Sequence, residues 1–114
     1  MIAMALMAVL SLDAAQAATQ QPPSYDEAVR CAGLTQAASE LEGGESGEGR
    51  SLYDAALYWS LTAIQMAQAA ARPDATAEAD QTRARIRAVR ELSAGDAAAR
   101  ADLQRCRART PTLG

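Results

Sequence analysis

The sequence predicts an all-α protein, a small antiparallel bundle of about four helices that is stapled by one disulfide. Three observations predict it. Apolar residues recur at spacings of three and four, glycine and proline separate the segments that do so, and one cysteine lies in the first helical segment and one in the last. The expected boundaries are a cleaved signal peptide at 1–17, a linker at 18–23, a helical domain at 24–110 and a tail at 111–114.

The leader is predicted from the apolar run at residues 2–10, which has the length of a signal-peptide hydrophobic region. Ala15 and Ala17 then give the small-x-small pattern that signal peptidase reads, so cleavage leaves Ala18 as the new N-terminus. The usual basic residue before the apolar run is absent. An uncleaved membrane anchor and a buried first helix are the alternatives, but a membrane span needs about 20 apolar residues and Asp13 interrupts this run.

The first helix is predicted to begin after Ser24, which forms a capping box with Glu27 three residues later. Gly33 within it allows a neighbouring helix to come close. The helix ends at the acidic glycine loop of residues 43–49. Its apolar face is expected to contain Ala28, Cys31, Leu34, Ala38 and Leu41.

The second helix is expected to open at Ser51, with Asp54 in its cap, and to end before Pro73. It carries apolar residues on nearly all sides, which is typical of the central helix of a bundle.

The third helix is expected at residues 75–92, and Ser93 or Asp96 is expected to cap a fourth helix that reaches about Arg109. The apolar stripe of the third helix is predicted to contain Ala79, Thr82, Ile86 and Val89, and that of the fourth Ala99, Leu103 and Cys106.

Cys31 and Cys106 are the two cysteines of the chain, and their separation fits neither a CxxC redox motif nor a zinc site. In a short exported protein such a pair is typical of a structural disulfide. Closing so long a loop stabilises the folded state by roughly 4 kcal/mol in the chain-entropy model. An antiparallel bundle places both cysteines near one end, which agrees with the bridge. Two unrelated buried thiols are the alternative.

Composition excludes several function classes. The chain has no histidine, which removes His-based acid–base catalysis, Ser-His and Cys-His nucleophiles and the usual zinc ligands. The formal net charge of -3 argues against nucleic-acid binding. No cofactor or metal is expected, since the carboxylates around the glycine loop lack the EF-hand pattern.

Two groups of residues are candidate binding surfaces. Tyr53, Tyr58 and Trp59 form an aromatic cluster that serves either as core or as a ligand or partner surface, and the core interpretation is favoured. Arg83, Arg87 and Arg90 share one face of the third helix, which is either a solvated face or an anion-binding face. The solvated face is favoured, because acidic residues neutralise part of the charge.

The leading functional hypothesis is therefore a periplasmic or secreted, non-enzymatic helical protein that acts by contact with an unknown protein partner, as an envelope accessory or stress-related protein. Membrane association is not expected after cleavage. In being short, helical and two-cysteine, the chain is similar in architecture to the small periplasmic acid-stress chaperones, although it shares no motif with them. The alternative is a small-molecule-binding protein that uses the region around Trp59.

Overall fold

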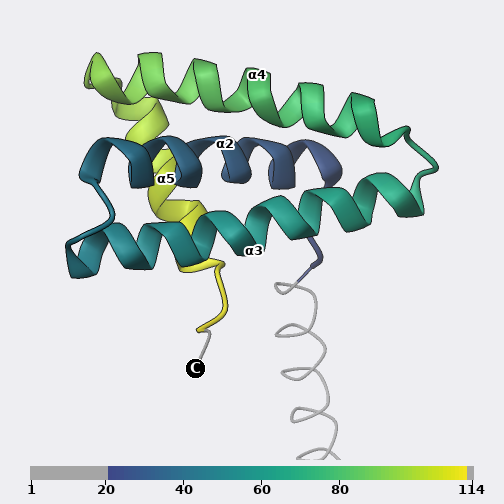
Figure 1. Ribbon diagram of the computed structural model, residues 1–114, viewed down its shortest axis with the longest axis horizontal. Helices are drawn as coiled ribbons and strands as arrows, with labels where there is room; N and C mark the ends of the chain where they lie inside the picture. The colour runs from purple at the N-terminus through teal and green to yellow at the C-terminus, as the bar shows by residue number, and fades with distance from the viewer. Residues whose placement is uncertain (1–20, 113–114) are drawn as a thin grey trace, which may run out of the picture.

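The computed structural model describes residues 21–112, which form four α-helices. In chain order these are α2 (Tyr25–Glu42), α3 (Gly47–Ala69), α4 (Asp74–Ser93) and α5 (Ala97–Ala108). Figure 1 shows that α2, α3 and α4 alternate in direction, while the short α5 crosses α2 steeply. The predicted all-α bundle with a disulfide is confirmed. The expected signal peptide at 1–17 lies outside the described residues.

The central helix is α2, which packs against α3, α4 and α5. The prediction that the second helix is central was wrong. Residues on several sides of α2 are small and buried, so that three helices approach it closely. The apolar residues of α3 instead divide between two faces: Leu52, Trp59 and Ala63 are buried, whereas Leu57 and Leu61 are exposed.

The core is built mainly from alanine around two large side chains, Leu34 and Trp59. Small residues let the helix backbones come close. One such close approach is at Gly33, where an added Cβ would lie 2.5 Å from the carbonyl carbon of Ala84. The expectation that Gly33 admits a neighbouring helix is confirmed, and the neighbour is α4.

The predicted apolar stripe of α4 was wrong in most positions. Ala79 and Thr82 are exposed, and Ile86 keeps 44% of its surface exposed. The buried residues of α4 are Ala77 and Ala88. The side of α4 that packs on the bundle has room only for small side chains, so Ala77 and Ala88 are buried and the larger Ile86 is exposed. Leu41, expected on the buried face of α2, is likewise 53% exposed.

Side-chain caps fix three of the helix starts. Ser24 accepts a hydrogen bond from the backbone N–H of Glu27, which is one half of the predicted capping box, while the Glu27 carboxylate pairs with Arg109. Asp96 caps α5 by accepting from the N–H of Ala99. The predicted start of α3 at Ser51 was wrong, because Ser46 caps this helix and extends it to Gly47.

Candidate functional site

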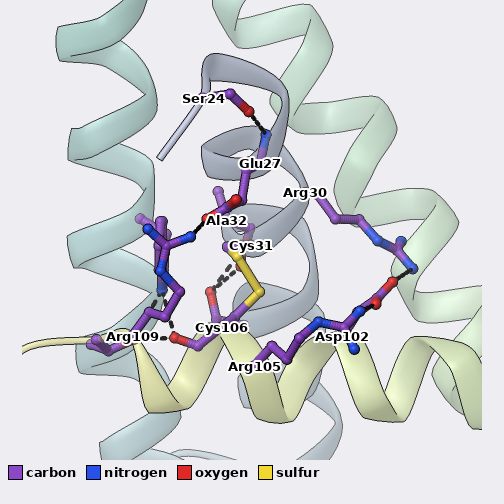
Figure 2. Close-up of a disulfide and its surroundings, with 12 residues drawn as sticks. Ser24, Glu27, Arg30, Cys31, Ala32, Asp102, Arg105, Cys106 and Arg109 are labelled. Atoms are coloured by element: carbon purple, nitrogen blue, oxygen red, sulfur yellow. Dashed lines mark hydrogen bonds and ion pairs between the residues drawn. A yellow bond between two sulfur atoms is a disulfide. The ribbon is translucent and has the colours of Figure 1, made fainter. Parts of the chain in front are cut away.

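The disulfide joins α2 to α5 near the C-terminal end of α5. Cys31 and Cys106 are bonded, with their Cα atoms 5.4 Å apart and each residue 3% exposed. Figure 2 shows the bridge between the two helices, flanked by charged side chains. The predicted structural disulfide is thus confirmed, and no cysteine remains as a free thiol.

Trp59 attaches α3 to the same end of α5. Its indole Nε1–H donates to the hydroxyl oxygen of Thr110 at 2.9 Å and lies 3.3 Å from the carbonyl oxygen of Cys106. The Thr110 hydroxyl in turn donates to that carbonyl at 2.8 Å. Tyr58 packs edge-on to the indole, with ring centroids 5.1 Å apart. Trp59 is 1% exposed and therefore belongs to the core.

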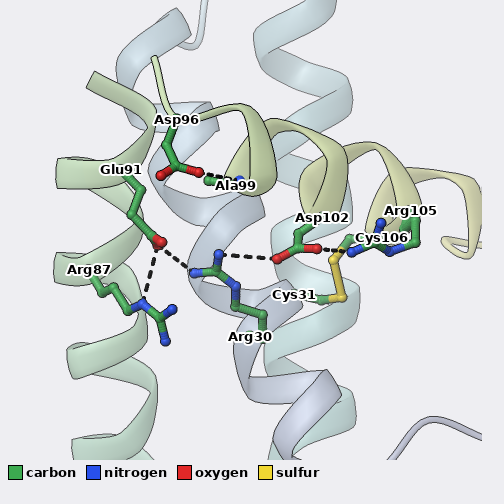
Figure 3. A network of polar contacts seen from close by, with 9 residues as sticks. All are labelled: Arg30, Cys31, Arg87, Glu91, Asp96, Ala99, Asp102, Arg105 and Cys106. Carbon is green, nitrogen blue, oxygen red and sulfur yellow. Dashed lines mark hydrogen bonds and ion pairs between the residues drawn. A yellow bond between two sulfur atoms is a disulfide. The ribbon is translucent and has the colours of Figure 1, made fainter. Parts of the chain in front are cut away.

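Arg30 links three helices through ion pairs. Its guanidinium donates to Glu91 on α4 at 2.7 Å and to Asp102 on α5 at 3.3 Å (Figure 3). Asp102 is also paired with Arg105, and Glu91 with Arg87 at 3.4 Å. The Arg30, Glu91 and Asp102 side chains are about one quarter exposed, so water screens them only in part. These carboxylates therefore hold the helices together.

Two further ion pairs connect the C-terminal part of α5 to the rest of the bundle. Arg109 pairs with Glu27 at the start of α2 (Figure 2), and Arg107 pairs with Glu48 at the start of α3. The hydrogen bond from Arg107 lowers the pKa of Glu48 below its usual value and raises the pKa of Arg107. Both contacts fasten α5 in place.

A third polar cluster lies where α2 begins. The Tyr25 hydroxyl donates to Asp80 on α4 at 2.8 Å, and the Arg72 guanidinium lies 4.4 Å from the centre of the Tyr25 ring. Hydrogen bonds from Tyr25 and from Arg83 lower the pKa of Asp80. Burial, and then the neighbouring Asp80, raise the pKa of the Tyr25 phenol.

The arginines predicted to share a face of α4 are exposed, and two of them have intrahelical partners. Arg83 lies 2.7 Å from Asp80, and Arg87 lies 3.4 Å from Glu91. Arg90 is exposed in the last turn of α4. This arrangement corresponds to the solvated face that the sequence favours, because nearby carboxylates neutralise part of its charge.

The most unusual surface is an apolar line along the solvent side of α3, which we call the α3 stripe. Its members are 56%, 45%, 58% and 37% exposed, and they are Tyr53, Leu57, Leu61 and Ile64. The spacings of four, four and three residues place them within one face of the helix. The largest apolar patch on a protein surface is often a functional one.

Charge is absent from the part of α3 that carries most of the stripe. Between Asp54 and Arg72 no residue is charged, although charged residues make up 22% of the whole chain. Cores of protein interfaces are depleted in charged residues in the same way.

Two grooves border the α3 stripe. One, of about 310 Å³, lies between α2 and α3 and is lined by Gln36, Ser39, Glu40, Tyr53, Ala56, Leu57 and Ser60. The other, also about 310 Å³, lies beside Ile64 and is lined from α2 and α4 by Gln36, Glu78, Gln81, Thr82 and Arg85. Gln36 lines both, so the grooves flank the solvent side of α2. An elongated partner can therefore contact three helices at once.

The three aromatics that the sequence grouped together do not form one surface. Trp59 is buried and Tyr58 is partly buried, whereas Tyr53 belongs to the α3 stripe. Sequence reasoning missed Leu61 and Ile64 as surface residues, because it read α3 as apolar on all sides. The uncharged run at residues 55–71 is the sequence signal by which the exposed side of α3 could have been found.

No family model, curated protein or solved structure gives a significant match to this chain. Within residues 21–112, we find no cluster of three or more potential metal ligands. None of the helices that the structure describes combines the length and apolar composition of a membrane span.

Proposed function

We propose that this chain is the precursor of an exported, non-enzymatic helical protein that acts by protein contact, and that the α3 stripe is its contact surface. The observation that carries the proposal is the exposure of Tyr53, Leu57, Leu61 and Ile64 along one helix face, the last three of them in the uncharged run at residues 55–71. Leaving these side chains in water forgoes hydrophobic stabilisation, which a partner with an apolar face recovers.

A function by protein contact also agrees with the roles of the carboxylates and cysteines, which form structural interactions within the fold. The carboxylates of Glu91 and Asp102 are engaged by Arg30, and the thiols are joined in a disulfide. The chain has no histidine to serve as a general base at neutral pH. These groups hold the helices together, which is the role that we expect of them in a protein that acts by binding.

Export is supported by two independent features. Residues 2–17 have the apolar run and the small-x-small ending of a signal peptide. A structural disulfide such as Cys31–Cys106 is typical of proteins in an oxidising compartment such as the periplasm. The intact mass of the protein recovered from a bacterial periplasm tests both. The expected mass is that of residues 18–114 less two hydrogens, and a full-length product that thiol reagents alkylate would refute export.

Binding of a small molecule around Trp59 is not proposed. The indole is almost fully buried, and its N–H is already occupied by Thr110. The volume around it is filled by protein side chains such as Tyr58.

A position-specific crosslink in living cells tests the contact surface. A photoreactive benzophenone amino acid replaces Leu61 in one strain and Leu41 in another, since both leucines are more than half exposed but only Leu61 lies in the stripe. We expect an adduct of one discrete mass at Leu61 that is absent at Leu41 and lost in the L57E background. Equal labelling at both positions, or none, would contradict the proposal.

A further inference from the structure

We infer that the partner of the α3 stripe is a second copy of this chain, which joins it in a two-fold dimer with the two α3 helices antiparallel. The inference rests on the proposed function, because it uses the same surface, and it adds the identity of the partner and the register of the contact.

The order of residues in the stripe carries the inference. Read forward, the members are separated by four, four and three residues; read backward, by three, four and four. The two orders differ by one residue, a rise of about 1.5 Å along the helix, so two antiparallel copies place the four side chains opposite one another to within that offset. Leu57 faces Leu61 of the second copy, and Tyr53 faces Ile64 of the second copy. A two-fold interface requires this kind of self-complementary patch.

Electrostatics favours a second copy over a charged partner. A surface that binds a charged protein carries the opposite charge, whereas residues 55–71 carry none. Two identical charged surfaces would repel each other, but two uncharged ones bring no charge into a buried contact. The complement of a neutral apolar stripe is another neutral apolar stripe, and the same chain supplies it.

The available area indicates a reversible dimer. The exposed parts of the four stripe residues give roughly 400 Å² per copy, if a large side chain presents about 200 Å² when free. A specific interface buries about 800 Å² per partner. The uncharged walls of the groove between α2 and α3, including Gln36, Ser39 and Ser60, supply further contact. An area this far below the standard size fits a weak dimer that dissociates on dilution.

Sedimentation equilibrium of the oxidised protein, purified after expression of the full chain, tests the inference. We expect twice the mass of one chain at high concentration and the mass of one chain on dilution. L57E is expected to weaken the dimer at least tenfold, because it buries an unpaired carboxylate. L41E, the same substitution on a comparably exposed leucine outside the stripe, is expected to change it less than twofold. Helicity by circular dichroism confirms that each variant is folded.

A pair of double variants tests the register. In L57E/L61R, each introduced carboxylate faces an introduced guanidinium of the second copy, so dimerisation is expected to recover relative to L57E. In L57E/L61E, like charges face each other, and the protein is expected to stay monomeric. A monomeric L57E/L61R beside a dimeric wild type would overturn the antiparallel register, and an equal loss in L41E would overturn the assignment to the α3 stripe.

The failure of the dimer is distinguishable from the failure of the proposed function. A monomeric wild type at all concentrations overturns the dimer. If the crosslink at Leu61 then gives an adduct that is not twice the chain mass, the contact function stands with another partner. If it gives none, both proposals fail.

Discussion

Replacing Gly33 by alanine is expected to destabilise the protein, although alanine is the better helix former. Gly33 lies on α2 against the backbone of α4 at Ala84. The added Cβ would lie 2.5 Å from the carbonyl carbon of Ala84, and 2.7 Å from both its Cβ and its carbonyl oxygen. Two of these three atoms belong to the backbone and cannot rotate away, so the two helices must separate.

Two opposing effects set the magnitude. Removing a glycine from a helix interior stabilises by about 1 kcal/mol. Overpacking costs about 1–3 kcal/mol, and the upper end applies because a helix backbone must move. Separation of α2 from α4 also lengthens the hydrogen bond between Arg30 and Glu91, now 2.7 Å. We therefore expect a net loss of about 2 kcal/mol in the free energy of unfolding, or about 10 °C in Tm for a domain of this size.

Urea unfolding of the oxidised protein, followed by circular dichroism, measures the change. The control is G47A in the first turn of α3, where a Cβ meets no neighbouring atom, so that alanine is expected to be neutral or stabilising. Adding A84G to G33A removes one of the three close contacts and should recover less than half of the loss. A G33A protein as stable as the wild type would refute the close approach of α2 and α4.

Three further predictions follow from local geometry. A71G is expected to raise the free energy of unfolding, measured by urea unfolding, by about 0.5–1 kcal/mol, because Ala71 has a φ of 56° that favours glycine. The control A70G, at a residue with negative φ, is expected to lower the free energy of unfolding. Reduction of the Cys31–Cys106 bond is expected to lower the same free energy by about 4 kcal/mol, measured in urea with and without reductant; an unchanged midpoint would contradict this. The pKa of Asp80 is lower in the folded state than in the unfolded chain, so the stability that this carboxylate adds is present above about pH 4 and is lost below it. We therefore expect a lower Tm at pH 3 than at pH 7. The variant D80N is expected to reduce this difference in Tm.

The sequence was sufficient where a residue acts locally. Ser24 and Asp96 cap their helices through hydrogen bonds within three residues, and the pattern alone reveals such caps. The disulfide was predictable because only one pairing of two cysteines exists within the chain. Gly33 was predictable as a site of close approach because glycine inside a helix otherwise costs stability.

The sequence was insufficient where tertiary contact decides. Glycine-rich residues 43–49 resemble a loop, yet Gly49 is helical, because Ser46 caps α3 by accepting a hydrogen bond from its N–H. A side chain at position 49 would not fit beside the carbonyl oxygen of Gly43. On α4, helical periodicity predicted that Ile86 is buried, whereas the buried residues that face the bundle are alanines. Hydrophobicity alone does not distinguish a buried alanine from an exposed one. The α3 stripe was missed for the related reason that its leucines resemble core residues.

The position of the disulfide also dictates an order of events during synthesis. Cys31 lies in the first helix of the described chain, and Cys106 follows α2, α3 and α4. Cys31 therefore cannot form its native bond until α2, α3 and α4 have emerged from the ribosome or from a membrane pore. During this interval the side of α2 that α5 later covers is open to oxidants and to other thiols. A cell that makes this protein has to protect that thiol, or to repair wrong bonds, before α5 arrives.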